Sequence, residues 1–105
     1  MVAVALTRDQ VIERLRGVEP DIRGLGVRRL ALFGSVARGE ARPHSDVDLL
    51  VEFSPGQKNF DRFLALSELL EQLLGRPVEL VTTEALSPYI GPHILAEAAD
   101  VLRAM

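Results

Sequence analysis

A wide apolar face at helical spacing in residues 60–74 is the strongest structural signal in the chain. Its apolar side chains are Phe60, Phe63, Leu64, Leu66, Leu69, Leu70, Leu73 and Leu74. Gly75 and Pro77 follow directly, which is typical of the end of a helix. The density of this face predicts a helix that packs across a β-sheet.

Two short apolar runs on either side of a glycine turn predict strands of that sheet. Residues 27–33 form the first run, bounded by Gly26 and Gly34, and residues 46–53 form the second. Side chains alternate between the two faces of a strand. One face of the second strand then carries Val47, Leu49 and Val51, and the other carries Asp46, Asp48, Leu50 and Glu52. We expect the first face to join the core and the second to carry charge.

The rest of the chain adds helices and a third strand. Thr7 and Gln10 have the spacing of a capping box, which predicts a helix that starts at residue 8. The expected elements are a helix over 8–17, a short helical turn over 35–39, a strand over 77–82 and a C-terminal helix over 93–104. Together they predict an α/β or α+β fold, a small mixed sheet covered by helices, built as a single domain over residues 1–105.

Composition narrows the classes of function. The net charge of −3 argues against nonspecific binding to a nucleic-acid backbone, and the absence of cysteine excludes thiol catalysis and Cys-ligated zinc. The apolar run of residues 1–6 is too short for a signal peptide or a membrane span. We therefore expect a cytoplasmic protein whose partner is neither a membrane nor a nucleic acid.

Asp46 and Asp48 form a candidate metal site. Carboxylates at positions i and i+2 of a strand point to the same side, with Cα atoms roughly 6.5 Å apart. Mg²⁺ prefers oxygen ligands, and a pair of ions can activate an attacking oxygen while stabilising a leaving pyrophosphate. An isolated Asp-x-Asp is more often a solvated strand edge or a cap, so the interpretation depends on what surrounds it.

A candidate triphosphate site precedes these carboxylates. Gly34 and Ser35 lie at the expected junction of strand and helix, where glycine allows close backbone approach and unpaired N–H groups attract anions. Ser35 can add a hydroxyl donor, and Arg38 and Ser45 can add charge or hydrogen bonds. Arg42 is a further candidate, although an exposed loop charge explains it equally well.

The order and spacing of these elements match a known pattern. The Gly34-Ser35 pair, followed after ten residues by Asp46-x-Asp48, resembles the signature of the DNA polymerase beta nucleotidyltransferase superfamily. More closely, Gly-Ser-x-Ala-Arg-Gly with Ser-Asp-x-Asp-Leu is similar to the minimal nucleotidyltransferases (MNT), the antitoxins of HEPN/MNT pairs. This resemblance implies a nucleotidyltransferase-like fold and a third carboxylate on a neighbouring strand, at the place of Glu79. Glu79 could instead face solvent, with Glu52 and Glu84 as alternative carboxylates.

The resemblance also implies an activity. Members transfer AMP from ATP to a hydroxyl acceptor with the help of Mg²⁺, here two ions held by Asp46, Asp48 and Glu79, and Glu79 would also deprotonate the acceptor. MNT proteins are commonly encoded beside a HEPN-domain ribonuclease toxin and act as its antitoxin, in some cases by adenylylating a toxin tyrosine. The implied partners are therefore ATP and a HEPN toxin, in a hetero-complex, with a homo-oligomer as a further option.

Two other functions stay open at this point. One is a non-catalytic antitoxin or binding module that neutralises its partner by direct contact. The other is transfer to a small molecule such as an aminoglycoside, which is less favoured because 105 residues leave no room for a second substrate-binding domain. His44 and His93 have no second ligand at metal spacing, and we assign them no catalytic role.

Overall fold

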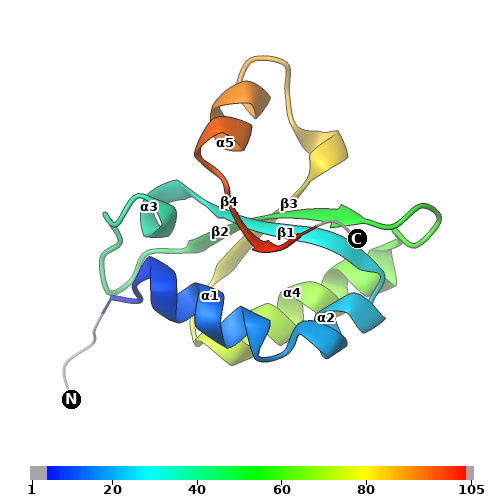
Figure 1. Cartoon of the computed structure of the whole chain (residues 1–105), viewed down its shortest axis with the longest axis horizontal. Helices are drawn as coiled ribbons and strands as arrows, with labels where there is room; N and C mark the ends of the chain where they lie inside the picture. Colours follow the sequence, from blue (N-terminus) through cyan, green and yellow to red (C-terminus); the bar gives the residue numbers. More distant parts are fainter. Residues whose placement is uncertain (1–4, 104–105) are drawn as a thin grey trace.

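A four-stranded mixed sheet forms the centre of the molecule in the computed structural model, which describes residues 5–103 (Figure 1). Its strands are β1 (Val27–Phe33), β2 (Val47–Phe53), β3 (Val78–Thr82) and β4 (Ala99–Leu102). They lie in the order β3-β2-β1-β4, with β1 antiparallel to β2 and β4, and β2 parallel to β3. The predicted fold class is confirmed.

Three helices cover one face of the sheet (Figure 1). They are α1 (Arg8–Arg16), α2 (Glu19–Gly24) and α4 (Phe60–Leu74). The predicted capping box forms at the start of α1, where the Thr7 Oγ1 accepts from the Gln10 N–H at 3.1 Å and the Gln10 side chain accepts from the Thr7 N–H at 3.0 Å. The long helix α4 has the predicted bounds, and it ends because Gly75 adopts the left-handed conformation, with φ of 65°.

The two faces of β2 differ as the sequence predicts. Val47, Leu49 and Val51 join the main core between the sheet and the three helices. On the opposite face, Leu50 belongs to a smaller cluster with Ala31 and Phe33. This second face is covered in part by the segment that contains a 3₁₀ turn, Thr83–Ala85, and α5 (Gly91–Glu97) (Figure 1).

The predicted C-terminal helix over residues 93–104 is wrong in its second half. The helix α5 ends at Glu97, and the following residues form the strand β4, while residue 104 lies outside the described residues. Helix propensity favours the prediction, but the free edge of β1 needs hydrogen-bond partners that a strand supplies. The Arg29 Nε donates to the Asp100 Oδ1 at 2.7 Å, which fastens β4 to β1.

A second short helix, α2, was not predicted. Pro20 lies in the first turn of α2, where its missing N–H leaves no intrahelical hydrogen bond unmade. The Arg23 guanidinium then donates to the Arg28 carbonyl at 2.8 Å and to the Arg103 carbonyl at 2.9 Å. Arg23 thus links α2 to the start of β1 and to the residue that follows β4.

Most of the N-terminal run, residues 1–6, lies outside the described residues, because the structure describes the chain from residue 5. Between residues 5 and 103, none of the helices is long and apolar enough to cross a membrane.

Candidate active site

The predicted site residues lie close together at one end of the strands, which we call the site edge of the sheet. β1 ends here and is followed by Gly34, and because β2 runs antiparallel to β1, β2 begins at the same edge. The strand β3 is parallel to β2 and also begins here, so Asp48 of β2 lies in register with Glu79 of β3. On its other side, Asp48 lies opposite Phe33 of β1. The topology therefore brings Asp48 and Glu79 side by side, next to the turn that starts at Gly34.

These carboxylates lie on the sheet face that is covered only in part. Asp48 alternates with Leu50, and Glu79 with Val81, whose side chains both belong to the smaller cluster under α5. Asp48 is half-buried, whereas Glu79 and Asp46, the residue that directly precedes β2, are exposed. No enclosed pocket is present in the part of the chain that the structure describes.

The electrostatic environment of Asp48 is unfavourable to its charged form. Burial is the largest cause that raises its pKa, from 3.8 to about 6, followed by the hydrogen bond and the negative charge of Glu79 and then by the charge of Asp46. The Arg38 guanidinium opposes this rise. Carboxylates held this close repel one another, and a bound divalent cation removes that repulsion.

The residues present fit a magnesium ion. Asp48 and Glu79 offer a pair of neighbouring carboxylates, and Asp46 is near enough to raise the Asp48 pKa. Between residues 5 and 103, no three acidic or histidine side chains are already arranged around a common point. Mg²⁺ usually binds through one or two carboxylates and fills its other positions with water and substrate phosphate. The role of the three carboxylates as metal ligands stays a prediction.

The burial of the charged Asp48 carboxylate beside Glu79 and Asp46 has a testable cost in stability. Because the folded-state pKa is the higher one, the cost is absent below pH 4, grows between pH 4 and 6, and is complete above pH 6. Without magnesium, we expect Asp48→Asn to raise the free energy of unfolding by about 1 kcal/mol at pH 7.5. A shielded group with this pKa would give about 3 kcal/mol, but Asp48 is partly exposed to water.

Urea unfolding in EDTA at pH 7.5 and pH 4 measures this effect. The gain should be much smaller at pH 4, where Asp48 is protonated in the folded state and partly protonated in the unfolded state. Glu68→Gln is the matched control, since Glu68 is an exposed carboxylate on α4. If Asp48→Asn raises the free energy of unfolding equally at both pH values, the raised pKa of Asp48 is contradicted.

Gly34 is the residue on which the local geometry depends. Its φ is +76°, a conformation that side chains rarely adopt, and a Cβ added there would lie 2.0 Å from the Asp48 Oδ2. The backbone of this turn therefore passes directly against the Asp48 carboxylate. Ser35, half-buried, is the second residue of the short helix α3 (Gly34–Ala37) that begins here.

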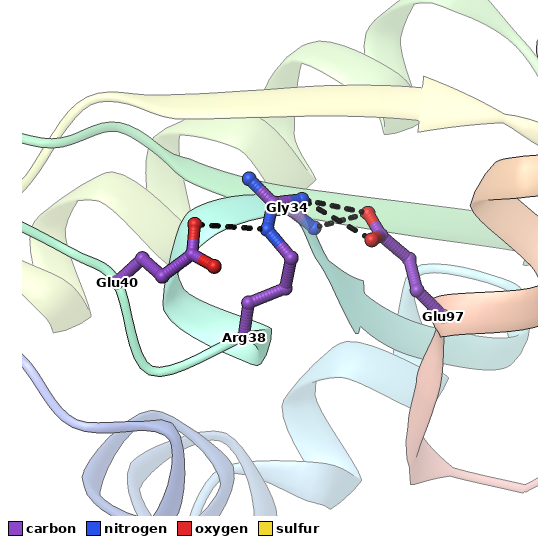
Figure 2. A network of polar contacts seen from close by, with 4 residues as sticks. All are labelled: Gly34, Arg38, Glu40 and Glu97. Carbon is purple, nitrogen blue, oxygen red and sulfur yellow. Dashed lines mark hydrogen bonds and ion pairs between the residues drawn. The ribbon is translucent and has the colours of Figure 1, made fainter.

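A polar network joins this turn to α5 (Figure 2). The Gly34 N–H donates to the Glu97 Oε1 at 3.0 Å, and the Arg38 Nη1 donates to both Glu97 oxygens at 3.1 and 3.2 Å. The Arg38 Nε donates to the Glu40 Oε2 at 3.3 Å. The Gly34 N–H, and after it Arg38, lower the Glu97 pKa, so the carboxylate is charged at neutral pH.

Sequence reasoning missed Glu97. The predicted helix over residues 93–104 left this residue without a partner, and a single acidic residue in an apolar segment is a weak signal. Its contact with Gly34 depends on β4, which begins two residues later and pairs with β1, with Ala99 opposite Leu32. The sequence pattern alone does not reveal that pairing.

Other candidates have different surroundings. The Ser45 hydroxyl oxygen accepts from the Arg42 N–H at 2.8 Å, which closes the loop before β2, and its predicted contact with phosphate is untested. The alternative carboxylate Glu84 pairs with Lys58 at 3.1 Å, beyond the far end of β3. Glu52 lies near the far end of β2, opposite Arg29. Neither alternative carboxylate lies at the site edge of the sheet.

Comparison with known proteins decides the family. A family model described as "Nucleotidyltransferase domain" matches residues 8–101. The chain belongs to this family. The nucleotidyltransferase is 38% identical over 97 residues to Protein adenylyltransferase MntA of Thermococcus cleftensis, an alignment that covers 91% of this chain and 97% of that protein. The predicted relation to the minimal nucleotidyltransferases is confirmed.

Solved structures agree with this nucleotidyltransferase fold. One, named "putative minimal nucleotidyltransferase", is 37% identical with a TM-score of 0.78, covering 90% of this chain and 95% of that chain. Another is a complex of tri-AMPylated Shewanella oneidensis HEPN toxin with MNT antitoxin, 15% identical with a TM-score of 0.66, covering 93% of this chain and 74% of that chain. At 15% identity the second comparison shows the fold alone.

Proposed function

We propose that this nucleotidyltransferase transfers AMP from Mg-ATP to a hydroxyl group, a tyrosine of a HEPN-domain ribonuclease toxin, and thereby acts as that toxin's antitoxin. The observation that carries the proposal is the Asp48–Glu79 pair beside the Gly34 turn, at the site edge of the sheet. Similarity to a protein adenylyltransferase over nearly the whole chain supports the same class of reaction.

Each site residue has a defined task in this reaction. Asp46, Asp48 and Glu79 would hold the cations, while the Gly34 turn and Ser35 would orient the triphosphate. Bound Mg²⁺ supplies positive charge that offsets the negative charge of the phosphates as pyrophosphate departs. Glu79 accepts the proton of the acceptor hydroxyl, whose oxygen then bonds to the α-phosphorus as the bond to pyrophosphate breaks. Arg38 offers its guanidinium to the phosphates.

Two observations support a protein as the acceptor. Asp46 and Glu79 are exposed and Asp48 is half-buried, so a large acceptor can reach the carboxylates. The relative from Thermococcus cleftensis, 38% identical over 97 residues, is named a protein adenylyltransferase. An acceptor that is itself a folded protein would supply the missing part of the binding surface.

A ribonuclease assay with the proposed HEPN partner separates catalysis from simple occlusion. Catalysis predicts that a small molar fraction of this protein inactivates the toxin, and only when Mg-ATP is present. The inactivated toxin should stay inactive after this protein is removed. Equal inhibition without ATP, at a one-to-one ratio and reversed by separation, would contradict the proposal and favour a non-catalytic antitoxin.

A further inference from the structure

The Glu97 carboxylate binds groups that the triphosphate is expected to use. It accepts from the Gly34 N–H at 3.0 Å and from the Arg38 Nη1 at 3.1 and 3.2 Å (Figure 2). An oxygen of a phosphate would take the same two donors in the same way, since both ligands are anionic acceptors of charge-assisted hydrogen bonds. The Glu97 carboxylate therefore lies where a phosphate oxygen would bind.

The two anions exclude each other at this position. The Gly34 N–H carries one proton, which cannot make a full hydrogen bond to two acceptors. A carboxylate and a polyphosphate within a few ångströms also repel each other strongly. The Arg38 guanidinium already donates to a second carboxylate, that of Glu40. The Gly34 N–H, in contrast, donates to Glu97 and has no second proton to offer a phosphate. One of the two anions must leave when the other binds.

Glu97 is free to leave. It is the last residue of the seven-residue helix α5, and its side chain is 32% exposed. The carboxylate can therefore turn into water without opening the sheet, because the next strand, β4, stays paired with β1 through residues that follow Glu97. The cost of the exchange is the loss of its hydrogen bonds to Gly34 and Arg38.

We propose that Glu97 is an internal competitor of the nucleotide, which occupies the phosphate-binding donors of the empty protein and is displaced by the triphosphate of ATP. This inference rests on the proposed function, because it takes the Gly34 turn as the triphosphate site. Glu97 thereby lowers the affinity for the nucleotide. Without ATP, the Gly34 N–H and Arg38 donate to Glu97, and ATP binds only after those hydrogen bonds break.

The test measures binding of Mg-ATP and of magnesium tripolyphosphate by calorimetry to the wild type, Glu97→Gln and Glu97→Ala. Removal of the competitor should tighten binding of both ligands by about three- to tenfold, with the larger gain for Glu97→Ala. The same variants should melt at a lower temperature than the wild type when no ligand is present, because they lose the bonds to Gly34 and Arg38. A purely structural role predicts the lower melting temperature without tighter binding.

Glu40→Gln is the matched control. It removes a negative charge beside the same arginine, but it leaves the bond between Glu97 and Gly34 intact. We expect Glu40→Gln to change the affinities for Mg-ATP and magnesium tripolyphosphate by less than about twofold. If the effect came only from the loss of a negative charge, Glu40→Gln and Glu97→Gln would gain affinity equally. Such equal gains would overturn the proposal.

The remaining outcomes also decide the question. If the wild type binds both ligands and the Glu97 variants bind them equally or more weakly, Glu97 does not compete with the nucleotide, and the proposed function is untouched. If neither the wild type nor any variant binds either ligand, the proposed function fails, and the competition fails with it.

Discussion

Replacement of both Asp46 and Asp48 by Asn should reduce AMP transfer by at least about 10³-fold, which corresponds to about 4 kcal/mol of lost transition-state stabilisation. Amides keep the size of the side chains but cannot neutralise a cation. The folded state should survive, because Asp48 is destabilising when charged in the metal-free protein. Transfer of label from [α-³²P]ATP to the partner protein measures the loss.

Glu52→Gln is the control for this experiment. Glu52 lies on β2, on the same face as Asp48 and four residues further along, and it is likewise half-buried. It lies toward the far end of the strand, opposite Arg29, so its replacement should leave transfer within about twofold of the wild type. If Glu52→Gln abolishes transfer and the double variant retains it, the site has been placed at the wrong end of the sheet.

Gly34→Ala should have the second large effect, on stability and activity together. The new Cβ would lie 2.0 Å from the Asp48 Oδ2 and 2.8 Å from its Cγ, and it would sit on a backbone with φ of +76°. The left-handed conformation costs about 1–2 kcal/mol for a residue with a side chain, and the clash must be relieved by moving Asp48. We expect the free energy of unfolding to fall by about 2–4 kcal/mol and transfer to fall as far as in the double Asp variant.

Gly39→Ala separates the two parts of this effect. Gly39 has nearly the same φ, +74°, but no heavy atom lies within 4 Å of an added Cβ. It should therefore lose about 1 kcal/mol of stability and keep its activity. Urea unfolding and the transfer assay on both variants test the comparison, and equal losses of activity would show that the contact between Gly34 and Asp48 has no special role.

The parts of the fold that sequence could predict are those whose signal is local. The helix α4 is marked by its apolar spacing and Gly75, and β2 by an apolar face of Val47, Leu49 and Val51. The strand β4 escaped prediction because its sequence suits a helix, and its conformation is decided by the exposed edge of β1. The helix α2 was missed because Pro20 fits both the end of one helix and the start of another.

The site residues also fall into two groups, those with a local sequence signal and those placed by pairing between distant strands. Asp46, Asp48, Gly34 and Ser35 follow from a short segment with fixed spacing, and alternation places Asp48 correctly on the face opposite the main core. The neighbour of Asp48 depends on strand order, which no local pattern fixes, so Glu79 was reached through family resemblance and is placed in register by the β2–β3 pairing. Glu97 depends on a pairing between distant strands, and neither route reached it.

The most direct test of the central claim is the intact mass of the proposed HEPN partner, measured after incubation with this protein and Mg-ATP. The account predicts a gain of one or more AMP units, absent with the Asp46→Asn, Asp48→Asn variant and absent when EDTA removes the metal. A toxin that binds this protein and is neutralised by it, but whose mass never changes, would contradict protein adenylylation and leave direct contact as the mode of action.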